Sequence, residues 1–200
     1  MKSKIVPIVV TLLLTRWFNF GLSHEISPEK NKQLKSIFSE ASAFTEKHLK
    51  LTDAQSAQIE KIIRGKLNPK HKNPTIYLAE SNEKGKPLGY VGFFDAKEPD
   101  GDIVPGAVGV KPDGAIAKII IFTHHANENP VAGESFLGQF VGKKVDDPHL
   151  WHPDHLIKMM KGHEAASSAA HKAIHRTSAI IAVGAGLKKL QVQTPRKNRK

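Results

Sequence analysis

The sequence predicts an α+β fold in which helices flank a mainly antiparallel sheet of two hairpins. Apolar residues recur at helical spacing in residues 28–65 and again in 164–183. Short runs rich in Ile, Tyr, Val and Phe lie between them, separated by turn-forming segments. A chain of 200 residues is long enough to bury one sizeable core. We therefore expect one domain over residues 24–187, with its C-terminal helices packed on the sheet.

Two helices are predicted before the sheet. A Ser-Pro pair at 27–28 supplies a cap and a proline at the first helical position. The helical spacing continues through Leu34, Ile37, Phe38, Ala41 and Phe44. We expect this helix to run to about Leu49. A second helix should follow Thr52, because Gln55 stands three residues later in a capping-box arrangement, and it should end near Gly65.

The central segment predicts four strands in two hairpins. Residues 75–80 and 87–96 (TIYLAE and PLGYVGFFDA) flank the turn-forming sequence Asn-Glu-Lys-Gly-Lys. Residues 102–110 and 115–125 flank Lys-Pro-Asp-Gly, which has proline and glycine at the positions of a tight turn. Each pair of strands is close enough in the chain to form a hairpin, so we expect a four-stranded sheet.

Helices are also predicted after the sheet. Residues 133–142 place Phe136 and Phe140 on one helical face, and we expect both rings to belong to the core. Residues 164–183 are rich in alanine and predict the last helix. The apolar end of this helix, residues 178–187, is too short to span a bilayer, which needs about 20 residues.

The first 23 residues have the order of a secretory signal, with Lys2 and Lys4, an apolar stretch over 5–14, and small residues before His24. The alternative is a retained N-terminal anchor, although Arg16 interrupts the stretch of about 20 apolar residues that a span needs. Both alternatives place the domain outside the cytoplasm. We expect an exported protein that is periplasmic or lies on the outer face of the membrane.

The formal charge of +11 is concentrated at the two ends of the chain. Residues 1–23 contain three basic side chains and 188–200 contain six, both without acidic ones, which leaves 21 basic and 19 acidic side chains between them. We expect the C-terminal segment to be a disordered basic tail that can contact a membrane surface carrying anionic lipid. Without a nucleic-acid motif or an interleaved aromatic patch, nucleic acid is not an expected partner.

The chain has no cysteine. This excludes disulfides, thiolate metal sites and iron-sulfur clusters. A redox function would therefore require a bound cofactor.

Four stretches follow one another in a characteristic order: LTDAQSAQIEKIIRGKL, KGKPLGYVGFF, VGVKPDGAIAKIIIFTHHANENPVAG and FLGQFVGKK. In order and spacing they resemble the FMN-binding domain family of the flavin-carrying subunits of sodium-translocating NADH:quinone reductase and Rnf-type electron-transport complexes. The resemblance covers about residues 38–183. It implies FMN as the cofactor and electron transport as the function.

The family's Glu-Thr-Pro-Gly-Leu-Gly loop is matched at Glu128, Pro130 and Gly133, with Asn129 in the threonine position. The resemblance implies that these four residues face the flavin, where Asn129 could offer its amide and Pro130 and Gly133 would fix the backbone. The histidine pair at 124–125 could also donate a hydrogen bond or a proton there. Without the resemblance, this segment is an ordinary turn.

The family's flavin-attachment motif is degenerate here. In the family, a threonine in Ser/Thr-Gly-Ala-Thr-x-Ser-Ser receives FMN from a flavin transferase, whereas this chain has KGHEAASSAA. The acceptor position falls on Ala165 or Glu164, neither of which has a hydroxyl, so we expect non-covalent flavin. Gly162, Ser167 and Ser168 could still bind an FMN phosphate at the helix start, where backbone N–H groups are unpaired. Glu164 would repel that phosphate, or simply complement the helix dipole.

The histidines offer a second chemistry. His171 and His175 stand one helical turn apart, and His152 and His155 follow a tryptophan. Imidazole binds zinc, copper or haem iron without any thiolate, so a histidine-based metal or haem site is an alternative. No HExxH-type pattern supports it.

Taken together, these patterns predict an exported FMN-binding protein that acts as an electron carrier or as an accessory to a membrane redox complex. No nucleophile-base arrangement can be argued from spacing, so we do not expect a stand-alone enzyme. Three alternatives stay open. They are a cofactor-free relative that binds a partner, the histidine-based site, and a covalent flavin moved to Ser167.

Overall fold

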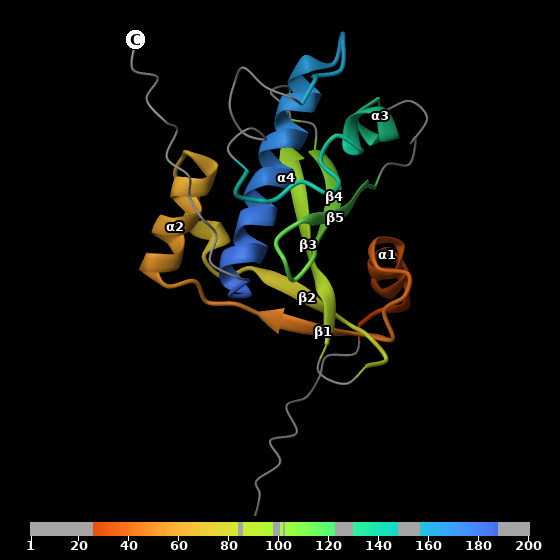
Figure 1. Cartoon of the computed structure of the whole chain (residues 1–200). Coiled ribbons are helices and arrows are strands. Elements are labelled where there is room, and N and C mark those ends of the chain that lie inside the picture. The colour runs from red at the N-terminus through yellow and green to blue at the C-terminus, as the bar shows by residue number, and fades with distance from the viewer. Residues whose placement is uncertain are drawn as a thin grey trace, which may run out of the picture.

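One sheet of five antiparallel strands forms the centre of the molecule (Figure 1). The computed structural model describes residues 26–83, 86–97, 101, 103–122, 130–147 and 157–187. The strands are β1 (Ala43–His48), β2 (Thr75–Glu80), β3 (Pro87–Lys97), β4 (Ile103–Val110) and β5 (Ile116–Ile121). They lie side by side in chain order. The fold is therefore α+β, as predicted.

Helices cover both faces of the sheet (Figure 1). On one face lies α1 (Pro28–Ile37), and on the other lie α2 (Asp53–Ile63) and the long α4 (Glu164–Gly184). The core on the α1 face consists of Leu34, Ile37, Phe38, Ala41, Tyr77, Ala79, Val91 and Ala107. The larger core lies between α4 and the opposite face of the sheet. The sheet has a core on each face because alternate residues of each strand point to opposite faces.

The predicted first helix, extended to about Leu49, is too long. α1 ends at Ile37, and after a turn the chain enters β1. The backbone N–H of Ser42 donates to the carbonyl of Glu80 at 2.8 Å, so this segment pairs with β2. Phe44 therefore lies in a strand rather than a helix. Strand pairing with a distant segment overrides the local apolar spacing.

The second predicted helix is confirmed as α2. The Thr52 hydroxyl accepts the N–H of Gln55 at 3.1 Å, and the Gln55 side-chain oxygen accepts the N–H of Thr52 at 2.9 Å. This is the predicted capping box. The helix ends before Arg64, which adopts a left-handed conformation with φ of 50°.

The two predicted hairpins are confirmed. β2 pairs with β3 and β4 pairs with β5, while β3 and β4 join them into one sheet. In the second turn, Gly114 has φ of +83°, and its N–H donates to the carbonyl of Lys111 at 2.9 Å. The sheet has five strands rather than the predicted four, because β1 was not predicted.

The helix predicted over residues 133–142 is mostly a series of turns. Only α3 (Glu134–Leu137) is helical, and it is preceded by the 3₁₀ helix η2 (Pro130–Ala132). The chain then turns back to the sheet, because the N–H of Gly142 donates to the carbonyl of Ile116 at 2.8 Å. Gly142 has φ of +79°, a conformation that favours glycine and ends helical geometry.

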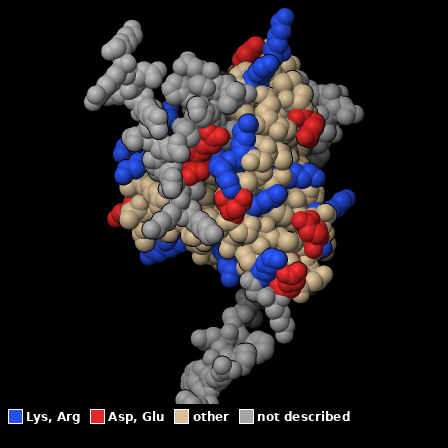
Figure 2. Space-filling view, in the orientation of Figure 1, with Lys and Arg blue, Asp and Glu red and all other residues tan. Residues whose placement is uncertain are grey.

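Charged side chains of both signs are interspersed on the face seen in Figure 2. This agrees with the near balance of charge counted between the two ends of the sequence. The predicted signal or anchor (1–23) and the basic tail (188–200) lie outside the described residues. Among the helices that the structure describes, none is long and apolar enough to cross a membrane.

Candidate functional site

One of the four stretches named above, FLGQFVGKK, is hydrogen-bonded to the segment that leads into α4. The side-chain oxygen of Gln139, just after α3, accepts the backbone N–H of Lys158 at 2.7 Å. The side-chain NH₂ of Gln139 donates to the carbonyl of Lys158 at 3.2 Å and to that of Ser135 at 3.1 Å. These bonds fix residues 157–160, which lead into α4, against the turn that follows α3.

A buried aromatic pair lies beneath this junction. Phe136 and Phe140 are both 0% exposed, and their ring centroids are 5.4 Å apart. The ring of Phe140 also contacts the His171 ring of α4, with centroids 5.6 Å apart. The expectation that both phenylalanines belong to the core is confirmed. They hold the segment after β5 against α4.

The loop residues are described only in part. Glu128 and Asn129 lie outside the described residues, as does the histidine pair at 124–125. Pro130 begins η2, and Gly133 is the half-buried N-cap of α3. The carbonyl of Gly133 accepts the N–H groups of Phe136 and Leu137 in the first turn of α3.

At the start of α4, a backbone N–H is hydrogen-bonded to the carboxylate of the first helical residue, Glu164. The N–H of Gly162 donates to Oε1 of Glu164 at 3.0 Å, and Gly162 has φ of +79°. This hydrogen bond, followed by that of the Glu164 backbone, holds the pKa of the Glu164 carboxyl below its ordinary value. The geometry agrees with the interpretation that Glu164 complements the helix start. The same carboxylate occupies the place where a phosphate would find the Gly162 donor.

Ser167 forms a buried link between α4 and the segment before it. Its hydroxyl accepts the N–H of Met160 at 3.0 Å and donates to the carbonyl of His163 at 2.8 Å, and the residue is 0% exposed. A phosphoester at this oxygen would remove the bond to His163 and bring a phosphate into the core. Covalent flavin at Ser167 therefore does not fit this conformation, whereas Ser168 is half-buried.

Backbone and side-chain groups that could donate to an anion lie on the outer side of the same turn. Ala165 is exposed and Ala166 is half-buried. The first four N–H groups of a helix have no intrahelical partner, so these backbone donors and the Ser168 hydroxyl suit a phosphate. Glu164 is the one group of this turn that opposes it.

The candidate histidines lie on the inner side of α4. His171 is half-buried beside Phe140, and His175 is buried. Burial, together with the charges of His171 and Arg64, holds the pKa of His175 well below its ordinary value. The part of the chain that the structure describes contains no group of three or more residues able to hold a metal ion. His152 and His155 lie outside it.

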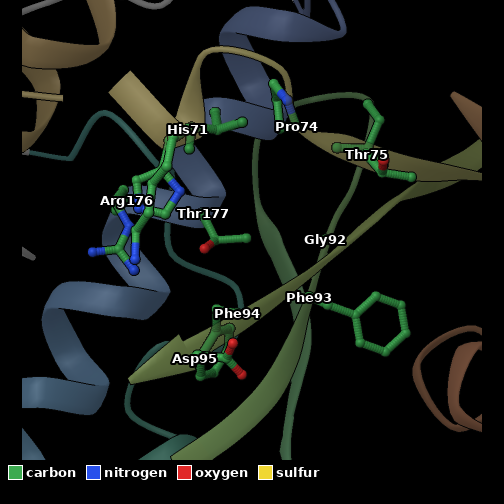
Figure 3. A pocket seen from close by; sticks show the side chains of 12 residues that line it. His71, Pro74, Thr75, Gly92, Phe93, Phe94, Asp95, Arg176 and Thr177 are labelled. Atoms are coloured by element: carbon green, nitrogen blue, oxygen red, sulfur yellow. The ribbon is translucent and has the colours of Figure 1, made fainter. Parts of the chain in front are cut away.

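A pocket of about 220 Å³, which the sequence did not predict, lies beside the middle of α4 (Figure 3). Its polar walls come from three segments, with His71 on the 3₁₀ helix η1 (Pro69–His71), Asp95 on β3 and Arg176 on α4. The one sequence signal for it is Arg176, the last charged residue before the apolar end of the last helix. Neither a protein-family model nor a curated protein matches the chain.

Proposed function

We propose that this chain binds FMN non-covalently at the start of α4 and acts as an exported electron carrier or as an accessory to a membrane redox complex. The observation that carries the proposal is the double hydrogen bond between Gln139 and Lys158. It joins the stretch FLGQFVGKK to residues 157–160, which lead into the helix where the family binds its phosphate. The first of these stretches is one of the four that carry the resemblance to the FMN-binding domain family, and the second precedes the degenerate attachment motif.

The roles of the residues follow from their places. The N–H groups of Ala165 and Ala166 and the hydroxyl of Ser168 would bind the phosphate, and the helix dipole would add to this attraction. The Pro130–Gly133 backbone would border the ring system. Bound FMN would supply one- and two-electron transfer, and the protein would tune the potential by hydrogen bonds and burial.

Non-covalent attachment follows from the hydroxyl groups near the acceptor position. Ala165 and Glu164, which align with the family threonine, have no hydroxyl. The hydroxyl of Ser167 is already used in two buried hydrogen bonds. A flavin transferase would therefore find no suitable oxygen at these three positions.

The test uses the mature chain, purified from an exporting host that also produces the flavin transferase. We expect a yellow protein whose flavin absorbance moves to the supernatant on acid precipitation. Ser168→Ala should weaken FMN binding, while Ser39→Ala, which removes an exposed hydroxyl beyond α1, should leave it unchanged. A colourless protein that also refuses added FMN would overturn the proposal. Colour retained in the pellet would overturn its non-covalent form.

Cell fractionation of the same host tests the export step. We expect the full chain to be found outside the cytoplasm, in the periplasmic or membrane fraction. Accumulation in the cytoplasmic fraction, with residues 1–23 intact, would contradict the expectation drawn from the N-terminal segment.

A cofactor-free, partner-binding relative is the second candidate, and one observation favours it. The helix start is already closed within the chain by the bond from Gly162 to Glu164, so no ligand is needed to satisfy that donor. A colourless and stable protein would support this candidate. The histidine-based alternative would instead show a metal- or haem-dependent absorbance that is lost in His171→Ala.

A further inference from the structure

The pocket in Figure 3 lies away from the start of α4. Arg176 is twelve residues after Glu164, which corresponds to about 18 Å along the helix axis. The pocket is bounded by residues of η1, β2, β3 and α4, and its polar side chains include Lys70, His71, Asp95, Arg176 and Thr177. An inference about it is therefore independent of the flavin proposal.

Arg176 is a partly buried cation without a full set of partners. Its Nε is buried and has no hydrogen-bond partner. Burial lowers the pKa of the guanidinium, while the nearby Asp95 carboxylate raises it again. Among the ion pairs of the described residues, none joins Arg176 to Asp95. Since an unpaired buried donor is costly, an acceptor that entered the pocket would be stabilised there.

The neighbouring polar groups suit the same acceptor. In Figure 3, His71 lies next to Arg176, and the hydroxyl of Thr177 is turned to the side on which Arg176 and Asp95 lie. Burial, followed by the charges of Arg176 and Lys70, lowers the pKa of His71 to about 4. The imidazole is therefore neutral at pH 7 and can donate one hydrogen bond, while Lys70 adds positive charge at the exposed edge.

The floor of the pocket is apolar and close-packed. A Cβ on Gly92 would lie 2.8 Å from Cγ2 of Thr177 and 3.0 Å from Cδ1 of Ile181, so α4 lies directly on the strand. Ile76 and Phe94 are buried beside Gly92, whereas Phe93 points to the other face of the sheet (Figure 3). The floor offers no competing hydrogen bonds to a bound group.

The outer wall is fixed by hydrogen bonds. Oδ1 of Asn68 accepts the N–H of Lys70 at 3.0 Å and so caps η1. The carbonyl of Lys72 accepts the N–H of Leu51 at 2.9 Å, which ties the end of η1 to the segment before α2. The pocket is thus preformed, and little conformational entropy would be lost when a ligand binds.

We propose that this pocket binds a small oxyanion, a carboxylate or a phosphate group, with Arg176 as the principal ligand and Thr177 and His71 as additional donors. A guanidinium matches such groups with two parallel hydrogen bonds. The volume of about 220 Å³ is below that of pockets for drug-sized ligands, so it suits a single anionic group. The exposed Asp95 carboxylate at the edge disfavours the more highly charged anion.

The test titrates the full mature chain with sodium acetate and, separately, with inorganic phosphate, at constant ionic strength and followed by NMR chemical shifts. We expect saturable shifts at residues 70–71, 92–95 and 176–177 with at least one of these anions. Arg176→Gln should weaken binding by about ten-fold or more. Lys172→Gln, which removes an exposed charge one turn earlier on α4, should change the affinity less than about two-fold. The anion that binds more tightly shows whether the pocket prefers a carboxylate or a phosphate group.

The proposal would be overturned by the absence of saturable shifts in the parent chain with both anions, or by equal affinities of Arg176→Gln and the parent. The anion-free Arg176→Gln variant should be at least as stable as the parent, because an unsatisfied buried donor has been removed. A large loss of stability would make Arg176 a structural residue instead. Thr177→Val, which keeps the side-chain shape and removes the hydroxyl, decides the matter if the first variant does not fold, since unchanged affinity would contradict the proposal.

Discussion

The first turn of α4 and the middle of the same helix satisfy their polar groups in different ways. At the first turn, Ser167 is buried and uses its hydroxyl both as donor and as acceptor within the chain. In the middle, Nε of Arg176 and the hydroxyl of Ser178 are buried without a hydrogen-bond partner. Because buried polar groups in folded proteins are rarely left unpaired, the middle of the helix is where a ligand would supply what the chain does not.

The contrast also separates structural from binding roles. Beside the first turn, Gln139 and Phe140 attach the preceding segment to α4, so polar and apolar contacts there build the fold. In the middle, Gly92 brings the helix onto the strand and leaves the polar groups around a preformed pocket. The two regions differ in whether their buried polar groups have hydrogen-bond partners within the chain, and not in the types of residue they contain.

The largest effect is expected from Phe140→Ala at the first region. The side chain is 0% exposed and contacts Phe136 and His171, so its removal leaves a cavity in the core. The free energy of unfolding should fall by about 3–5 kcal/mol, as measured by urea denaturation followed by circular dichroism. Val141→Ala is the matched control, because Val141 is 45% exposed and should change stability by less than about 0.5 kcal/mol. Similar losses in both variants would mean that the junction is not a packed core.

The two buried serines of α4 test the comparison directly. Ser167→Ala leaves the N–H of Met160 without its acceptor and should lower the free energy of unfolding by about 1–3 kcal/mol. Ser178→Ala removes a buried hydroxyl that has no partner and leaves a methyl side chain, so it should be neutral or raise stability by about 1 kcal/mol. Both residues are 0% exposed and lie on one helix, so burial is matched. Equal losses would remove the distinction between the two regions.

Acid should destabilise the protein through the pocket histidine. The pKa of His71 is lowered from 6.5 to about 4 by burial and by the charges of Arg176 and Lys70. The unfolded chain therefore takes up a proton below pH 6.5 that the folded protein does not, and stability falls progressively as the pH drops toward 4. His175, lowered in the same direction by burial first, adds to the loss. Because His71 is partly exposed, we expect about 1–2 kcal/mol from it.

Urea denaturation at a series of pH values between 7 and 5 measures this loss, in a window above the ordinary pKa of the carboxyl groups. His71→Gln should flatten the profile by removing one of the two titrations. A parent profile that is flat across the window would contradict the burial of both histidines.

Local patterns made part of this fold predictable. The capping box of Thr52 and Gln55 and the Lys-Pro-Asp-Gly turn involve residues only a few positions apart, so their geometry is encoded where they stand. β1 was missed because Phe44 also fits a helical spacing, and its true partner strand lies more than thirty residues away. The class of fold depends on the first kind of pattern, which is why it was correct.

The sites were harder to predict than the fold. The resemblance pointed to Ser167 as a residue of the candidate site. It could not show that the Ser167 hydroxyl is hydrogen-bonded to the backbone of Met160 and His163, because this depends on how the chain before α4 packs. The pocket combines residues from η1, β3 and α4, which are about a hundred residues apart from end to end. Only packing brings His71 and Arg176 together, and no spacing in the sequence encodes that meeting.

The smallest effect is expected at Glu164, which either opposes a phosphate at the helix start or only complements the helix dipole. Its carboxylate accepts the Gly162 N–H, which lowers its pKa, so its contribution to stability is present above its ordinary pKa and is lost as the pH falls through the lowered one. Glu164→Gln should therefore lower the stability of the protein slightly at pH 7.

If the phosphate of FMN binds at this turn, the same change should strengthen FMN binding by about two- to five-fold, because a like charge is removed from the helix start. Glu29→Gln, at the first turn of α1, is the matched control and should leave flavin affinity unchanged. Fluorescence titration with FMN measures the flavin affinities of both variants. A weaker affinity in Glu164→Gln would show that the carboxylate supports the ligand rather than opposing it, and would move the phosphate away from the first turn of α4.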